Sequence, residues 1–434
     1  MKSFTACVLA LFYLTAVAVQ AGAPAGDRVP SHWIASWGTA QQLAPPSVPP
    51  WVRRPAQPDS ANGAPENRPP AQPSVFPDRL VAQTVRMVIR STVAGRAVRV
   101  SLSNSFGLAP VRIDAAQIAR FDGNASIHPG SSHALTFGGR EFVVLAPGAQ
   151  ICSDPVQLAV RAQEDLAVSL YVGGDSGAPT AHSLGLRTAY VAAGNQAASP
   201  TLQSATQFRS YLWLSGLEVL GSRDTATIVA FGDSITDGYS TTPGADASWP
   251  SVLARRLAAD RSVPPRAVIN MGISGNRVLR EGAGSSALAR FDRDVLARPG
   301  ARWVILIEGI NDISFNAFPG LPESEIASAA DIIAGYRQLT QRARMHGLQV
   351  IGGTLMPFEG VPTYSEAGER IRQEVNRWIR ESGEFDTVVD FDAVTRDPAK
   401  PSRLRASFDA GDHIHPNDEG NRAMAEAVPL LRFR

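Results

Sequence analysis

Hydrophobic and polar residues alternate along the first half of the chain. Val85, Met87 and Ile89 alternate with polar residues, and residues 95–104 repeat the pattern. Short alternating runs separated by Gly, Pro and Asn turns are typical of two packed antiparallel sheets, each with one face toward solvent. We therefore predict a β-sandwich domain over residues 30–222.

From Arg223 onward the pattern changes. Runs that are apolar throughout now alternate with segments of helical spacing. Such strands indicate a parallel sheet covered by helices on both faces, which carries its functional site beyond the carboxyl ends of the strands. We predict a second domain over residues 223–434. Its expected strands lie in 225–234, 265–275, 302–312, 348–358 and 386–394, and its expected helices in 249–260, 286–300, 327–347 and 366–383.

A proline-rich segment interrupts the first domain. Residues 44–77 are poor in aliphatic side chains and cannot bury enough apolar surface to fold, so we predict an extended surface loop. Trp33 and Trp37 precede it, four residues apart. They could stack on a sugar, but packing in the core is the interpretation we favour.

The N-terminus has the layout of a signal peptide. Lys2 is followed by an apolar run over residues 6–19 and then by small residues, with cleavage expected after Ala21 or Ala23. We assign residues 1–23 to this signal. The apolar run is short for a membrane span, which needs about 20 residues. The sequence therefore predicts a secreted or periplasmic protein without stable membrane insertion after cleavage.

Charge and cysteine content narrow the possible functions. The 434 residues carry 41 basic and 40 acidic side chains, so no bulk charge attracts a polyanion, and we expect no nucleic-acid partner. Of the two cysteines, Cys7 lies in the predicted signal and only Cys152 remains after cleavage. No disulfide within the mature chain is then possible. The oligomeric state is open.

The tripeptide Gly-Asp-Ser occurs twice, ending at Ser176 and at Ser234. Either serine could be a nucleophile or a turn residue. Ser176 follows an alternating strand in the first domain, with His182 nearby, and we interpret it as a turn serine. Ser234 ends the first wholly apolar run and precedes a helix, which is where a parallel sheet carries its chemistry.

Further polar residues follow the other predicted strands of the second domain. A hydroxyl nucleophile needs a base, the base needs an orienting acid, and the developing oxyanion needs hydrogen-bond donors. This topology would bring groups of all these kinds together. The segments are "FGDSITDGYS", "NMGISGNRV", "EGINDIS" and "DHIHPNDEG".

In this order, the four segments resemble the four blocks of the SGNH, or GDSL, hydrolase family. The resemblance covers about 225–425, and each block alone is a weak signal. The leading "HWIASWGTA" and the helix "ALARFDRDVL" also look like a secreted bacterial subgroup with a β-rich domain ahead of the catalytic one. The resemblance implies a three-layer αβα, flavodoxin-like domain with a five-stranded parallel sheet.

Carried over residue by residue, the resemblance makes Ser234 the nucleophile, His415 the general base and Asp412 the acid that orients it. The oxyanion donors would be the backbone N–H groups of Ser234 and Gly275 and the side-chain amide of Asn311. Without the other blocks, each could be an ordinary turn or capping residue.

Two histidines compete for the role of the base. His413 directly follows Asp412, whereas His415 lies three residues after it and before Pro416. An acid three residues before the base can fold back on a tight turn and leave the second ring nitrogen facing the serine, so we predict His415. His413 could then be a supporting or substrate-loop residue.

No cofactor or metal is expected. Residues 282–287 fit a dinucleotide fingerprint but follow no apolar strand directly, and the seven histidines show no metal-binding spacing. The combined prediction is an exported serine esterase with a small-molecule or polysaccharide ester substrate. We predict a short acyl group, acetyl on a carbohydrate, since nothing in the sequence resembles a lipase lid. Alternatives are a lipase or lysophospholipase acting on longer acyl chains, and a polysaccharide-binding protein with a secondary or inactive hydrolase domain.

Overall fold

The structure, a computed structural model, describes residues 31–42 and 77–434. The predicted signal peptide, 1–23, lies outside these residues, as does all of the predicted loop 44–77 except Pro77. Both stay predictions.

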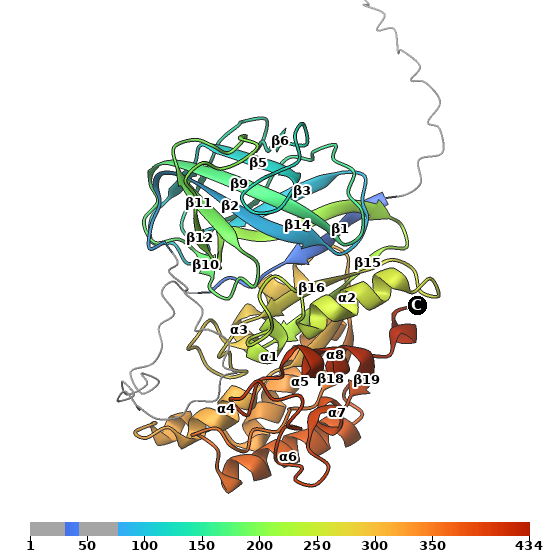
Figure 1. Cartoon of the computed structure of the whole chain (residues 1–434). Coiled ribbons are helices and arrows are strands. Elements are labelled where there is room, and N and C mark those ends of the chain that lie inside the picture. Colours follow the sequence, from blue (N-terminus) through green and yellow to red (C-terminus); the bar gives the residue numbers. More distant parts are fainter. Residues whose placement is uncertain (1–30, 43–76) are drawn as a thin grey trace, which may run out of the picture.

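The first part of the described chain is built from antiparallel strands (Figure 1). One sheet has the order β1-β14-β3-β8 and a second has the order β12-β11-β2-β9-β5-β6, with two-stranded sheets β10-β13 and β4-β7 beside them. The bounds are β1 Ser31–Gly38, β2 Val81–Ser91, β3 Val98–Ser103, β4 Val111–Ile113, β5 Ala115–Arg120, β6 His133–Ala134, β7 Val143–Leu145, β8 Gln150–Cys152, β9 Glu164–Asp175, β10 Ala181–His182, β11 Ala189–Ala193, β12 Thr206–Phe208, β13 Tyr211–Leu212 and β14 Leu214–Ser222.

One hydrophobic core joins the two larger sheets. The alternating residues of β2 pack there against those of β3 and β14, which confirms the predicted sandwich of antiparallel sheets. Trp37 packs against this core with its ring 4.9 Å from that of Tyr211. Trp33 is partly buried under the guanidinium of Arg99. Trp37 is therefore a packing residue, as preferred from the sequence.

The expectation of one wet face per sheet is wrong for β2. Both its faces are buried from Thr84 to Ile89. On the outer face, the fully buried Arg86 donates to Ser169 Oγ at 2.9 Å and to the carbonyl of Ser199 at 2.7 Å. Ser169 is the cross-strand neighbour of Arg86 in β9, and the loop that carries Ser199 covers this face, so a polar residue at an outward position does not mean exposure.

The second part contains a five-stranded parallel sheet with the order β16-β15-β17-β18-β19. This order, with the first strand of the sequence second in space, is that of flavodoxin-like folds and confirms the predicted fold class. The strands are β15 Ala226–Gly232, β16 Arg266–Gly272, β17 Ala301–Ile307, β18 Gln349–Gly353 and β19 Thr387–Val389.

Helices cover both faces of this sheet (Figure 1). Helix α2 packs on α8 and α8 on α7, while α5 packs on both α3 and α6. The helices are α1 Ser234–Asp237, α2 Trp249–Ala259, α3 Ala287–Phe291, α4 Ile310–Ser314, α5 Ala329–Met345, α6 Glu366–Glu381, α7 Phe391–Thr395 and α8 Asp418–Ala427. Within the described residues, none of the helices is both long and apolar enough to cross a membrane.

Two predicted segments differ from the structure. The strand expected over 386–394 ends at Val389, and Asp390 then caps α7 by accepting from the N–H of Ala393. The helix expected over 286–300 is interrupted after Phe291 by a π-helical turn over Asp292–Leu296. In the first case, a local capping interaction outweighs the apolar pattern.

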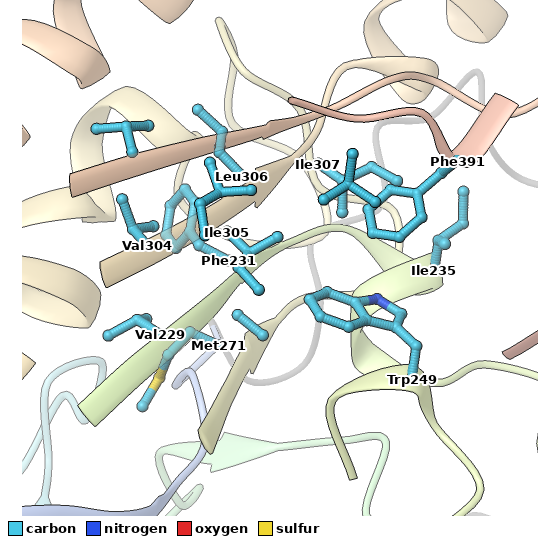
Figure 2. Packing of buried hydrophobic residues seen from close by; sticks show 14 of the residues in the cluster. Val229, Phe231, Ile235, Trp249, Met271, Val304, Ile305, Leu306, Ile307 and Phe391 are labelled. Carbon is cyan, nitrogen blue, oxygen red and sulfur yellow. The ribbon is translucent and has the colours of Figure 1, made fainter. Parts of the chain in front are cut away.

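The core of the sheet is apolar on both faces, as Figure 2 shows. Val229 and Phe231 of β15 are fully buried, like Val304 and Leu306 of β17 beside them. Trp249 of α2 is equally buried and packs near Phe391. Strands buried on both sides explain why these runs show no polar alternation.

Strand β1 lies against the parallel sheet as well as in its own. Its Ala35 donates its N–H to the carbonyl of Pro299 at 2.8 Å and accepts from Thr227 Oγ1 at 2.9 Å. Gln42, just after β1, donates to the carbonyl of Ala283 at 3.0 Å. The pairing of strands changes from antiparallel to parallel between β14 and β15.

The domain boundaries 30–222 and 223–434 stay a prediction.

Candidate active site

Ser234 lies where β15 ends and α1 begins. The strand stops at Gly232, and the Asp233 carboxylate accepts the N–H of Ile235 at 2.9 Å, which caps the helix. Ser234 is therefore the first helical residue, at the carboxyl end of a strand inside the sheet. Its hydroxyl lies at the edge of the sheet where this fold carries its ligands.

A glycine in the neighbouring strand lets α1 approach. A Cβ on Gly272, at the end of β16, would lie 2.2 Å from the backbone nitrogen of Asp237. Any larger residue would push α1, and Ser234 with it, away from the strand ends.

Asp412 and His415 form a tight turn of their own. The Asp412 carboxylate accepts the backbone N–H of His415 at 3.0 Å and its ring Nδ1–H at 2.7 Å. Burial acts to raise the pKa of Asp412, but these bonds outweigh burial and hold the pKa below its usual range. Asp412 is thus held as a carboxylate that orients the imidazole.

The C-terminal helix brings this turn to Ser234. Asp418 and Asn421 of α8 accept the backbone N–H groups of Thr242 and Trp249, at 2.8 and 2.9 Å, so α8 is tied to the segment that follows α1. His415 Nε2 then lies 2.8 Å from Ser234 Oγ. The three predicted triad residues are joined in one chain of hydrogen bonds.

His413 lies outside that chain. Its Nδ1 is 2.6 Å from Asp409 Oδ2, and its side chain is 53% exposed. Its φ of 68° lies in the left-handed region, and its ring lies next to Gly360. This is the arrangement expected for the histidine that is not the base.

Gly275 and Asn311 lie at the ends of the two strands that flank β15. Gly275 follows β16 with a φ of 80°, a conformation that favours glycine. Asn311 lies in α4 after β17 and donates one amide hydrogen to the carbonyl of Asn276 at 2.9 Å. Its second amide hydrogen remains for an acceptor. The structure thus places the Asn311 amide beside the residue that follows Gly275.

Asp312 holds the loop that carries Gly275. Its carboxylate accepts the N–H groups of Val278 and Leu279 at 2.7 and 3.1 Å. Burial raises the pKa of Asp312 to about 6. The loop is therefore attached to α4 at Asn276 and again at Val278 and Leu279.

A buried arginine connects the ends of β15 and β16. Arg290 of α3 donates to the carbonyls of Gly232 at 2.9 Å and Met271 at 2.7 Å, and to the side-chain oxygen of Asn276 at 2.8 Å. Its ion-pair partners Asp294 and Glu308 are also fully buried. One side chain thus links β15, β16 and the Gly275 loop.

Two further carboxyl groups are buried under the nucleophile. Burial raises the pKa of Asp233 to about 7, and burial together with the charge of Asp233 raises that of Glu308 well above its usual value. Both side chains are fully buried, and hydrogen bonds out of contact with water are stronger than those in water.

Three contacts of the site were not predicted from the sequence. The ring of Tyr239 lies 4.4 Å from that of His415 and Tyr239 is 41% exposed, but a single aromatic after a turn has no distinctive pattern. Asp312 lies in the segment "EGINDIS", but nothing in that pattern gives it a role of its own. Arg290 did leave a signal: it shares the buried face of its helix with Ala287 and Phe291, and a charge there needs partners.

Comparison with known proteins identifies a family for the second part of the chain. Residues 230–423 match the model of the GDSL-like Lipase/Acylhydrolase family. A search of curated proteins finds no match to the chain.

Similar solved structures include three bacterial enzymes. An acetylxylan esterase from Geobacillus stearothermophilus is 23% identical over 48% of this chain and 93% of its own, with a TM-score of 0.37. An aryl esterase from M. smegmatis is 20% identical over 46% and 95%, also at 0.37. A GDSL-like lipase from Bacteroides thetaiotaomicron is 19% identical over 46% and 84%, at 0.35.

The family match covers all four motif blocks up to α8. Residues 230–423 are a GDSL-like lipase/acylhydrolase domain, and the protein is by class a carboxylic ester hydrolase.

Proposed function

We propose that the protein is an exported serine esterase that cleaves short acyl groups, acetyl above all, from a carbohydrate or glycoside through an acyl-enzyme. The observation that carries the catalytic part is the hydrogen-bond chain from Asp412 through His415 to Ser234, with distances of 2.7 and 2.8 Å. This is the nucleophile, base and acid arrangement of serine hydrolases.

Each atom of the triad then has one task. His415 Nε2 takes the proton of Ser234 as Oγ attacks the ester carbonyl, and the Asp412 carboxylate stabilises the imidazolium through Nδ1. The carbonyl oxygen becomes an oxyanion, which the N–H groups of Ser234 and Gly275 and the Asn311 amide stabilise. The imidazolium returns its proton to the departing alkoxide, and water repeats the sequence on the acyl-enzyme.

The apolar surface near the triad supports a short acyl group. A long acyl chain needs a contiguous exposed apolar patch to bind. Among the described residues, Tyr239 is the one exposed large hydrophobic side chain with a ring contact to the triad. The others lie elsewhere in the chain, at Val81, Leu108, Val144, Ile326, Met345 and Leu431.

A series of p-nitrophenyl esters from acetyl to palmitoyl tests the proposal. We expect the highest kcat/KM with acetyl and a steep fall beyond about four carbons, since among the described residues Tyr239 is the one exposed large hydrophobic side chain in ring contact with the triad. Acetylated oligosaccharides should then release acetate. Highest activity on palmitoyl would favour the lipase or lysophospholipase alternative instead.

The rival binding function has its own test. If the protein binds to insoluble polysaccharide but hydrolyses none of the esters, the polysaccharide-binding alternative is correct and the hydrolase part is inactive. Export is supported by the layout of residues 1–23. N-terminal sequencing of the protein from the producing cells should give a start after Ala21 or Ala23, and an intact Met1 would contradict export by this signal.

A further inference from the structure

A buried histidine of the β-rich part lies against the catalytic sheet. His182 of β10 has its Nε2 2.9 Å from Asp237 Oδ1 and its Nδ1 2.7 Å from the carbonyl of Ala40. Carboxylate and carbonyl oxygens accept hydrogen bonds, so both ring nitrogens donate and His182 is an imidazolium. The side chains of the pair are 4% and 3% exposed.

Asp237 connects this histidine to the Gly275 loop. It ends the helix that Ser234 begins. Its second oxygen, Oδ2, accepts both the backbone N–H of Ser274 at 3.0 Å and the Ser274 hydroxyl at 2.7 Å. Ser274 directly precedes Gly275, so the peptide that carries the Gly275 N–H is one residue away from a carboxylate that His182 holds.

The charges around the pair make this contact strong. Burial acts to lower the pKa of His182, but the charge and hydrogen bond of Asp237 outweigh it and raise the pKa above its usual value. Tyr211 of β13 faces the ring at 6.5 Å, and Arg187 and Asp246 line the same cavity, of about 90 Å³. Removal of His182 would leave the Asp237 carboxylate buried without its cation, which is costly.

We propose that His182 is a positioning residue for ester hydrolysis, which acts through Asp237 and Ser274 to hold the Gly275 N–H where the oxyanion forms. The inference rests on the proposed function. It gives the β-rich part a task in catalysis itself: it supplies the cation that orients the carboxylate beneath the oxyanion loop.

The experiment compares three variants of the full chain with p-nitrophenyl acetate. H182L removes the donor to Asp237, and H182Q keeps an amide that can donate to it. R187Q is the matched control: Arg187 is also a mostly buried side chain of the β-rich part and donates to Asp246 across the same interface at 2.8 Å. It has no bond to Ser274 or Asp237 among the described residues.

We expect H182L to lower kcat about 10-fold or more with little change in KM. This loss is smaller than the roughly 10²–10³-fold loss of kcat that follows removal of an oxyanion donor. Inhibition by a trifluoromethyl ketone, which forms a tetrahedral adduct, should weaken by the same factor. H182Q should recover most of the loss. R187Q should keep kcat within about twofold of wild type even where its Tm falls, since it breaks an interface ion pair and leaves the oxyanion loop intact.

Hydrogen exchange of residues 273–279 gives a readout that needs no ester hydrolysis. Exchange there should be faster in H182L than in R187Q and wild type, because the Ser274 N–H loses a fixed acceptor. If H182L does not fold, S274A removes the hydroxyl bond to Asp237 while the backbone N–H bond stays, and it should show the same changes at a smaller size. Unchanged kcat and exchange in the folded variant, or an equal loss of kcat in R187Q, would overturn the inference. A wild-type protein that cleaves no ester would defeat the proposed function instead, and exchange alone would then decide whether His182 holds the loop.

Discussion

Two Gly-Asp-Ser tripeptides in this chain lie in opposite surroundings. Ser176 follows β9, where its hydroxyl accepts the N–H of Leu80 at 2.9 Å and donates to the carbonyl of Gly177 at 2.7 Å. Ser234 follows β15, where its hydroxyl lies 2.8 Å from His415. The same three residues make a closed turn in the antiparallel sandwich and a candidate nucleophile in the parallel sheet.

The difference lies in where each kind of sheet leaves its strand ends. Antiparallel neighbours alternate in direction, so the end of β9 meets turns whose backbone groups satisfy Ser176. In the parallel sheet, β15, β16 and β17 all end at one edge, where Ser234, Gly275 and Asn311 gather. The topology of the sheet therefore decides whether a serine hydroxyl forms hydrogen bonds with nearby backbone groups or is available to a base.

The largest expected effect separates the two serines. Ser234→Ala should lower kcat for p-nitrophenyl acetate by about 10⁴-fold or more, because loss of the nucleophile removes the covalent path. Ser176→Ala should leave kcat within about twofold, since its hydroxyl bonds only the backbone in the described structure. Undiminished turnover by the folded Ser234 variant would refute the mechanism.

The two histidines of the C-terminal turn should differ nearly as much. His415→Gln should lower kcat about 10²–10⁴-fold, the usual contribution of a general base. His413→Gln should stay within a fewfold, because it loses only its exposed bond to Asp409. The pH–rate profiles of both variants check the assignment. An inactive His413 variant beside an active His415 variant would reverse it.

A buried asparagine from each part tests the oxyanion role. Asn311→Ala should lower kcat about 10²–10³-fold, the cost of one oxyanion donor. Asn104 in the sandwich is equally buried and donates to the carbonyls of Ala109 and Leu145, both at 3.0 Å. Asn104→Ala should lower the Tm but leave kcat unchanged. Equal losses of kcat in both would mean that the Asn311 effect is structural.

The smallest effect concerns acid residues whose pKa values are shifted in opposite directions. Burial acts to raise the pKa of Asp165 in the sandwich, but Arg90 and Arg187 outweigh it and hold the pKa below its usual value. Burial raises the pKa of Asp312 at the catalytic strand ends to about 6. Asp165 then contributes stability above about pH 4 that is lost on acidification. Asp312 contributes stability near pH 4 that is lost as the pH rises toward 6.

Denaturant titrations between pH 3 and pH 7 check this contrast. Relative to wild type, Asp312→Asn should lose less free energy of unfolding between pH 4 and pH 6, by on the order of 2 kcal/mol. Asp165→Asn should lose less than wild type below pH 4. The same pH slope in both variants would show that the two sites do not differ in this way.

Much of the candidate site could be predicted because its residues lie in short local motifs. Asp412 and His415 are three residues apart, and their contact is made within one turn. The Asp233 cap that places Ser234 first in α1 spans two residues. Spacing along the chain is sufficient information for contacts of this kind.

Other contacts join distant segments and left no such pattern. His182 meets Asp237 across 55 positions, and Arg290 meets Gly232 across 58. In the sequence His182 is distinguished only as a neighbour of Ser176, but in the structure its ring nitrogens contact Asp237 and the carbonyl of Ala40. Which partner a buried charge finds depends on how elements pack, which the order of residues does not state.

The amino-acid sequence by itself determined the two kinds of sheet and the residues at the strand ends. Alternating and continuous apolar runs specify how many faces of a strand are buried, and glycine turns specify where strands end. Tertiary structure alone decided that both faces of β2 are covered and that the sandwich reaches the Gly275 loop through His182 and Asp237. The hydrophobic pattern of a strand indicates that the strand is buried. Which segments cover it depends on contacts between distant parts of the chain, which form only when the chain folds.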